Sequence, residues 1–171
     1  MRILWGLFLL FTMVLSSQTL AAEIFTLDGY WLTKKGDAVV RMSACEEGSS
    51  EYCGWIYWLR DDAPKHDLKH PNVKLRGRSL CGTRAVHGFT AGDKTNNWGG
   101  GFAYKASEGK TYKAKAWMET NERIDFRGYV GIPALGKTTY LTRVKADDYE
   151  ECKKLEPVKM KATQKKKSFN Q

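Results

Sequence analysis

The chain has 171 residues, of which 42% are hydrophobic and 12% aromatic, and its formal net charge is +9. This length fits one domain with a short extension, and the apolar and aromatic content excludes an intrinsically disordered protein. The tail at 153–171 contributes +6 and Arg2 contributes +1, which leaves only +2 for residues 3–152 and argues against a nucleic-acid-binding core.

The first 22 residues have the three parts of a secretory signal peptide. Arg2 is followed by the apolar run 3–15 and then by small residues, and cleavage after either Ala21 or Ala22 fits the pattern. A membrane anchor is the alternative, but this run is shorter than the ~20 apolar residues that span a bilayer. The sequence therefore predicts bacterial export, with the mature chain in the periplasm or secreted.

Short strand-like runs separated by turn residues follow along the chain, and no stretch has the 3.6-residue apolar period of a helix. The runs cover residues 27–33, 38–42, 53–60, 98–105, 111–118, 123–130 and 138–144. In the fifth run, apolar side chains alternate with Lys113 and Lys115, as expected for a strand with one wet face. Residues 23–152 are therefore predicted to form an all-β domain, either an antiparallel barrel or a sandwich.

Two segments depart from this pattern. Residues 61–97 are irregular, and their charged, Pro-containing first part is expected to form a long loop over one end of the barrel. Residues 153–171 are Lys-rich with little apolar content, which predicts a disordered tail. The run 55–59 is apolar on both faces, so its outer side should also be covered, and the 61–95 segment is the candidate cover.

The mature chain contains four cysteines: Cys45, Cys53, Cys81 and Cys152. An even number in an exported protein favours disulfides over a zinc site, since the sequence has no C-x-x-C pair. Three pairings are possible. Cys45 and Cys53 flank a short loop between two strand-like runs, which favours a bridge between them, and Cys81–Cys152 then follows by elimination.

Two motifs resemble functional sites but lack the required context. Residues 131–138 match the P-loop pattern G-x-x-x-x-G-K-T, yet a strand-like sequence follows where a P-loop needs a helix, so we expect no nucleotide binding. His66 and His70 have the spacing of a helical metal site, but Pro64 and Pro71 exclude a continuous helix there, which favours a polar loop without metal. No residue pattern indicates a nucleophile or an acid–base pair, so neither an enzyme nor a cofactor is expected.

Gly29, Trp31 and Arg143 indicate how the barrel closes. In lipocalin-like barrels, a G-x-W on the first strand and an Arg near the end of the last strand meet at the closed end. The guanidinium then lies over the indole, a contact of roughly 0.5–2 kcal/mol. These three residues are therefore expected to have a structural role. With them, residues 23–152 resemble a small antiparallel up-and-down β-barrel of lipocalin or calycin type with about eight strands.

These features together resemble the uncharacterised bacterial family known as domain of unknown function 2147. The matching segments follow the family's order over about residues 28–144 and are 29–31, 39–41, Cys45, 53–59, 78–82, 98–100, 109–112, 127–131, 135–138 and 142–143. The resemblance implies an exported lipocalin-like barrel with no established enzymatic activity. The chain departs from the family at Lys105, at Leu141 and at His70, where the family tends to have Asp, Trp and Asn.

The expected function is the binding of a small apolar or amphipathic ligand inside the barrel, whose eight strands leave room for packed side chains or one small ligand. Alternation assigns seven side chains to the lining: Trp55, Tyr57, Phe102, Tyr104, Tyr112, Met118 and Phe126. The alternative is that these side chains fill the barrel. The protein would then act in the cell envelope through its surface and through its Lys-rich tail, which would contact an anionic surface.

Overall fold

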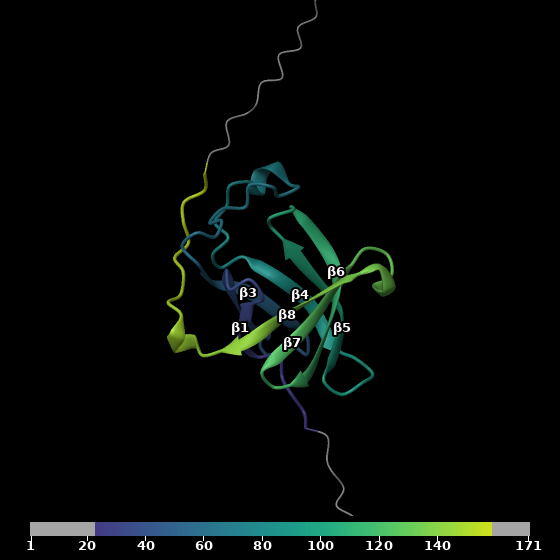
Figure 1. Cartoon of the computed structure of the whole chain (residues 1–171). Coiled ribbons are helices and arrows are strands. Elements are labelled where there is room, and N and C mark those ends of the chain that lie inside the picture. The colour runs from purple at the N-terminus through teal and green to yellow at the C-terminus, as the bar shows by residue number, and fades with distance from the viewer. Residues whose placement is uncertain (1–22, 159–171) are drawn as a thin grey trace, which may run out of the picture.

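The computed structural model describes residues 23–158, which form a closed barrel of eight antiparallel strands (Figure 1). The strands are β1 (Gly29–Thr33), β2 (Ala38–Ala44), β3 (Tyr52–Leu59), β4 (Arg84–Ala91), β5 (Asn97–Lys105), β6 (Lys110–Thr120), β7 (Arg123–Tyr129) and β8 (Lys137–Val144). Each strand pairs with the next in the chain, and β8 pairs with β1. The predicted up-and-down barrel is therefore confirmed. The predicted signal peptide and residues 159–171 of the predicted tail lie outside the described residues.

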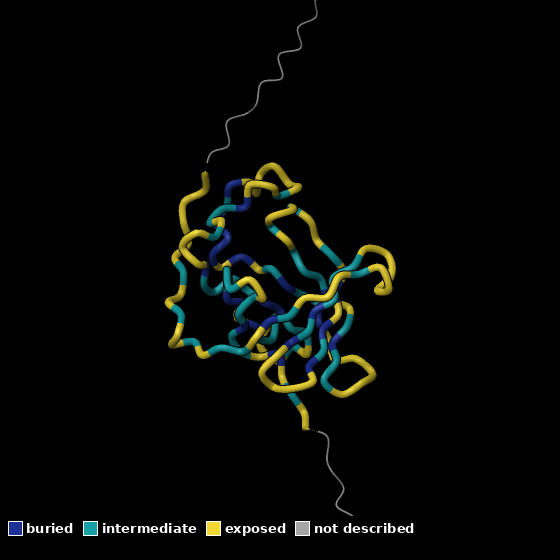
Figure 2. The backbone as a smooth tube through the Cα atoms, in the orientation of Figure 1, coloured by how far each residue is buried: buried dark blue, intermediate teal, exposed yellow. Residues whose placement is uncertain are grey.

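Alternation along the strands separates the core from the surface. On β6, Ala114, Ala116 and Met118 are buried, whereas Lys113 and Lys115 between them are exposed. The largest fully buried side chains come from several strands and from the segment before β1. Figure 2 shows buried residues recurring along the strands, whereas the loops are mostly exposed. They include Trp31, Phe89, Leu27, Met42 and Ile124.

Strand β4 lies inside the segment for which the sequence predicted only irregular structure, and that prediction was wrong for residues 84–91. Val86 and Phe89 both belong to the core although they are three residues apart. Gly88 lies between them with a φ of +79°, a conformation that favours glycine and interrupts the alternation. A period of two is therefore not visible in this part of the sequence.

Residues 145–158, which we call the strap, run from the end of β8 along the outside of the barrel to the long β3–β4 connection (Figure 1). The Tyr149 ring packs edge-on against Trp58 with 4.9 Å between centroids, and Cys152 N–H donates to the Tyr57 carbonyl over 2.8 Å. The strap thus supplies the outer cover of β3 that had been assigned to residues 61–95.

Two disulfides, Cys45–Cys53 and Cys81–Cys152, fix the loops of the barrel. They form the pairing that the sequence favoured among the three alternatives. The first closes the β2–β3 hairpin, and the second joins the β3–β4 connection to the strap. Two disulfides are typical of a protein of an oxidising compartment, either periplasmic or extracellular.

The two ends of the barrel differ. At one end, which we call the base, Leu27 is fully buried and its carbonyl accepts a hydrogen bond from Trp31 Nε1 over 2.8 Å. At the other end, which we call the loop end, the chain makes its connections between β1 and β2, β3 and β4, β5 and β6, and β7 and β8.

Within residues 23–158, no helix has the length and hydropathy needed to cross a membrane.

Candidate binding site

Three of the seven predicted lining residues face the interior. Met118 and Phe126 are buried in the core. Tyr112 lies opposite Ala103 near the loop end, is half-buried, and donates a hydrogen bond to the carboxylate of Glu108. Met118 and Phe126 therefore fill the barrel as part of its packed core.

The other four predicted lining residues lie on the outer face, which corrects the prediction. They are Trp55, Tyr57, Phe102 and Tyr104. Trp55 pairs with Arg41, whose guanidinium lies 5.7 Å from the centre of the indole ring. Phe102 pairs with the exposed Lys113 and stacks on His87.

Two glycines explain this reversal. Gly54 and Gly101 occupy inward positions next to the aromatic residues. A Cβ added to Gly101 would lie 2.2 Å from the ring of Phe89, and one added to Gly54 would lie 2.9 Å from Val40. Close packing around the two glycines leaves room for no larger side chain, so the aromatic neighbours point outward.

The predicted closure residues meet at the base. The Arg143 guanidinium lies 4.0 Å from the centre of the Trp31 ring. A Cβ at Gly29 would lie 2.6 Å from Arg143 Nη1, so only glycine leaves room for this guanidinium. Arg143 also donates four hydrogen bonds, which go to the carbonyls of Thr26, Asp28 and Asn121 and to Asn121 Oδ1.

The buried carboxylate of Asp67 joins the β3–β4 connection to β5. The Asp67 side chain is fully buried, and its Oδ2 accepts hydrogen bonds from Nε and Nη2 of Arg78, both over 3.2 Å. The Tyr104 hydroxyl donates to Asp67 Oδ1 over 2.8 Å. Burial, reinforced by this bond to a carboxylate, raises the pKa of Tyr104 to about 12.

This pKa predicts a loss of stability at high pH. Between pH 10 and pH 12, Tyr104 keeps its proton in the folded protein, whereas in the unfolded chain it loses it at its ordinary pKa of about 10. We expect the free energy of unfolding to fall across this window, as measured by urea unfolding at successive pH values. The fall should be smaller in Tyr104→Phe, and equal slopes in the two proteins would contradict the assignment.

His66 and His70 serve separate contacts. His66 Nε2 lies 3.0 Å from the Glu156 carbonyl of the strap, and the His70 ring packs against Tyr104 with 5.4 Å between centroids. Each ring is thus positioned by its own neighbour. The segment from His66 to His70 does not form the continuous helix on which a metal site with this spacing depends.

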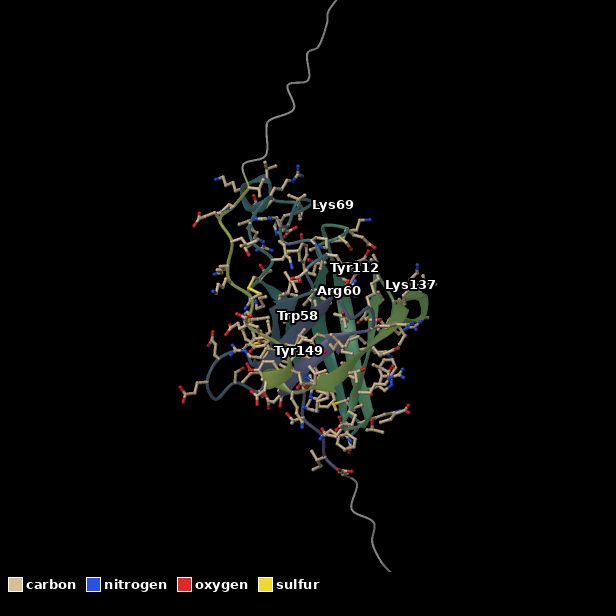
Figure 3. The ribbon with its side chains drawn as sticks, turned by 60° about the vertical axis from the view of Figure 1, so that its left-hand side comes forward. Trp58, Arg60, Lys69, Tyr112, Lys137 and Tyr149 are labelled. Carbon is tan, nitrogen blue, oxygen red and sulfur yellow. A yellow bond between two sulfur atoms is a disulfide. The ribbon has the colours of Figure 1, made fainter. Side chains whose placement is uncertain are left out.

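A hollow of about 340 Å³ lies between the end of β3, the β3–β4 connection and the strap. In Figure 3, Trp58 and Tyr149 mark the place where the strap meets the barrel. Its lining combines apolar, acidic and basic side chains with one disulfide, namely Trp58, Leu59, Asp61, Lys65, Ser79, Cys81, Glu150, Glu151, Cys152, Lys153 and Leu155. The Cys81–Cys152 bond therefore forms part of its wall.

Ser79 is the unusual group in this lining. It is 8% exposed, and its Oγ is the one buried side-chain oxygen or nitrogen without a hydrogen-bond partner among residues 23–158. Its backbone is fixed, because Ser79 forms a β-bridge with His66 and the next residue, Leu80, donates its N–H to the Lys65 carbonyl over 2.8 Å. Ser79 therefore belongs to the lining with a fixed backbone, and its hydroxyl is enclosed by protein without a hydrogen-bond partner.

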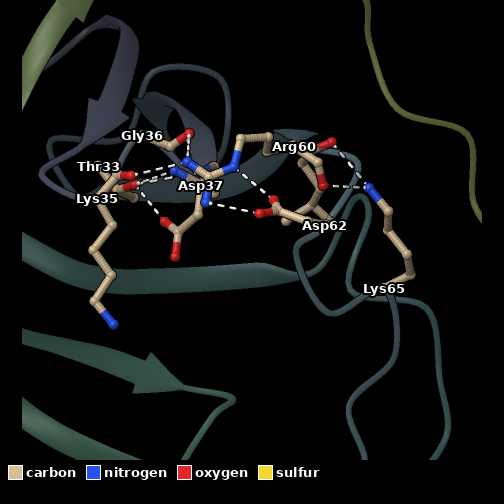
Figure 4. A network of polar contacts seen from close by, with 9 residues as sticks. Thr33, Lys35, Gly36, Asp37, Arg60, Asp62 and Lys65 are labelled. Carbon is tan, nitrogen blue, oxygen red and sulfur yellow. Dashed lines mark hydrogen bonds and ion pairs between the residues drawn. The ribbon is translucent and has the colours of Figure 1, made fainter.

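The charged side chains of the hollow differ in whether they are already bound to other groups of the protein. Lys65 Nζ donates to the carbonyls of Leu59 and Arg60, over 3.1 and 2.6 Å, so its ammonium is already bound (Figure 4). Arg60 is itself fixed by Asp62 and by the β1–β2 turn. The hollow thus offers three carboxylates against one further ammonium group, that of Lys153.

The sequence did not indicate this site. Apart from the two cysteines, its lining residues had no assigned role, and they come from three segments far apart in the chain. The one available signal was the disulfide pairing, which places residue 81 beside residue 152. A half-buried aromatic pair such as Trp58 and Tyr149 has no periodicity that would reveal its contact.

Comparison with known proteins supports both the family and the fold. The model of a family described as "Uncharacterized protein conserved in bacteria (DUF2147)" matches residues 29–143. The solved structure of protein HP1028 from Helicobacter pylori, described as belonging to the lipocalin family, matches with a TM-score of 0.62 and 23% identity. This match covers 72% of the present chain and 86% of the other. No curated protein matches the sequence. The resemblance inferred from the motifs is confirmed, as is the lipocalin-like fold.

Proposed function

The chain belongs to the uncharacterised bacterial family DUF2147 and has a lipocalin-like barrel, and from this premise we propose that it is a non-enzymatic binding protein for a small amphipathic ligand. The proposed ligand site is the hollow beneath the strap. We further propose that the chain is exported to the periplasm or beyond by its N-terminal signal sequence. The two disulfides support that location.

The unpartnered hydroxyl of Ser79 is the observation that carries the proposal. A buried hydroxyl without a partner destabilises the fold by about 1–3 kcal/mol. The hydroxyl is enclosed in the ligand-free protein, so the proposed ligand reaches it when a neighbouring side chain of the lining moves, and the hydrogen bond then formed removes this cost. The hollow has the size of a small-ligand site, which is typically about 300–1,000 Å³. The hollow thus combines the volume of a small-ligand site with an unsatisfied polar group in its lining.

The lining also indicates the chemistry of the ligand. Trp58, Leu59 and Leu155 offer apolar contact, and Ser79 offers a hydroxyl. The carboxylates are exposed, and their negative charge favours a hydrogen-bond donor or a positive charge on the head of the ligand. An amphiphile with an amino or hydroxyl head group fits this set best.

Ser79→Ala tests the site through two opposite effects. Without the hydroxyl, the ligand-free protein should become more stable by about 1 kcal/mol, because an unsatisfied polar group is gone. Binding of decylamine should weaken by about threefold to tenfold, the equivalent of one lost hydrogen bond. Urea unfolding and titration calorimetry measure the two effects.

The neighbouring Thr83 provides the matched control. Its Oγ1 donates to the Ser79 carbonyl over 2.9 Å, so Thr83→Val removes a hydroxyl that does have a partner and should lower the stability. If Ser79→Ala destabilises the protein as Thr83→Val does, the hydroxyl is not orphaned and the proposed site is wrong. Equal decylamine affinity in the wild type and Ser79→Ala would contradict the ligand role alone.

A further inference from the structure

Positive charge is concentrated at the loop end of the barrel. The four connections at this end, residues 34–37, 60–83, 106–109 and 130–136, together with the three lysines at the adjoining strand ends, Lys105, Lys110 and Lys137, contain eleven Lys and Arg against five Asp and Glu. The rest of 23–152 contains nine basic and thirteen acidic residues. The loop end therefore carries +6 and the remainder −4, although the barrel as a whole is close to neutral.

Exposed apolar side chains gather at the same end. Of the nine large apolar side chains that are exposed among residues 23–158, six lie on the β3–β4 and β7–β8 connections. Three of them, Val130, Ile132 and Leu135, are 73%, 58% and 78% exposed and fall within six consecutive residues of the β7–β8 connection. Figure 2 shows this connection as an exposed projection from the barrel. Exposed apolar groups this close together mark an interaction site.

The β7–β8 connection is held in a fixed shape. The Arg127 guanidinium donates to the carbonyls of Pro133 and Ala134, over 2.6 and 2.9 Å, and to Thr138 Oγ1 over 2.9 Å. A Cβ at Gly136 would lie 2.7 Å from the Gly128 carbonyl, so the connection packs directly on β7. Polar contacts within the loop thus hold its apolar side chains in solvent.

This segment is the P-loop match of the sequence. It contains only the 3₁₀ turn η2 (Pro133–Leu135), and strand β8 follows it, as its strand-like sequence predicts. A phosphate site of the P-loop type needs a helix at this point. The segment therefore lacks the structure of a phosphate site, and such a site does not account for its exposed apolar side chains.

We propose that the loop end docks on an anionic lipid bilayer, with Ile132 and Leu135 entering the membrane interface. Basic side chains of the same end would contact acidic headgroups. Among them are Lys137, which follows the apolar tips at the start of β8, and Lys69 on the β3–β4 connection, which lies apart from Lys137 in Figure 3. A soluble polyanion or an anionic cell-wall polymer would match the charge but would leave Val130, Ile132 and Leu135 in water. Apolar tips among basic residues fit a surface with acidic headgroups above hydrocarbon. This surface is separate from the hollow beneath the strap and does not depend on it.

Flotation with lipid vesicles tests the proposal. The wild-type chain, purified without its signal sequence, should float with vesicles of phosphatidylcholine and phosphatidylglycerol and remain unbound with phosphatidylcholine alone. The double variant Ile132→Ser/Leu135→Ser should bind the anionic vesicles at least tenfold more weakly. Both side chains are exposed, so its thermal unfolding should match that of the wild type.

Two controls separate this surface from other sources of binding. Ile24→Ser removes an exposed apolar side chain at the base and should leave vesicle binding unchanged. Deletion of 159–171 removes five Lys beyond the described residues and should leave binding that still depends on Ile132 and Leu135. The proposal is overturned if the double variant floats like the wild type, if the truncated chain no longer binds, or if uncharged vesicles bind equally well.

Discussion

Replacing Asp67 with alanine is expected to lower the free energy of unfolding by about 3 kcal/mol, among the largest effects of any single substitution in this protein. The carboxylate is fully buried and accepts hydrogen bonds from Arg78 and Tyr104. Its removal leaves a guanidinium and a phenol without their acceptor. Because the Arg78 side chain is 32% exposed and can be partly solvated, the effect should lie at the lower end of the range for buried pairs. Urea unfolding near neutral pH measures it.

A surface ion pair in the same connection provides the comparison. Arg60 and Asp62 are paired in a similar way, but both side chains are largely exposed, so Asp62→Ala should change the stability by less than about 1 kcal/mol. Comparing Asp67→Ala with Asp62→Ala tests how much burial adds to the loss of stability, because both substitutions remove a carboxylate that pairs with an arginine. Equal losses in the two variants would show that Asp67 does not hold the β3–β4 connection.

The barrel was predictable because it follows local rules. Period-two alternation identified β6, and turn residues separated most strands. The pairing of Trp31 with Arg143 was predictable because closure of such a barrel brings its first and last strands together. Strand β4 was missed because the φ of Gly88 interrupts its alternation.

The residues that line the interior were predicted less well, because alternation does not show which of the two faces of a strand points inward. Aromatic residues were taken as inward because they are large and apolar, but the core around Phe89 and Val40 leaves room only for Gly101 and Gly54. Which face of a strand points inward thus depends on the volume of residues distant in sequence. The hollow beneath the strap was hidden for the same reason, since it exists only where β3, the β3–β4 connection and the strap meet.

Removing the Cys81–Cys152 disulfide as Cys81→Ser/Cys152→Ser is expected to lower the free energy of unfolding by about 4 kcal/mol. The bond closes a loop with a sequence separation of 71, whereas the Cys45–Cys53 bond closes one of 8. Loop entropy therefore assigns only about 2.5 kcal/mol to the shorter bridge. Urea unfolding of the two double variants should preserve this order.

The same pair of variants links stability to the proposed function. Without its disulfide, the strap keeps only noncovalent contacts, such as the packing of Tyr149 on Trp58 and the hydrogen bond from Cys152 to Tyr57, so it should become susceptible to limited proteolysis. The hollow loses part of its wall, and binding of decylamine should be lost with it. Cys45→Ser/Cys53→Ser leaves the hollow intact and should keep its affinity. If both variants bind decylamine equally well, the ligand site lies elsewhere; if only the Cys81/Cys152 variant loses binding, the strap forms the site.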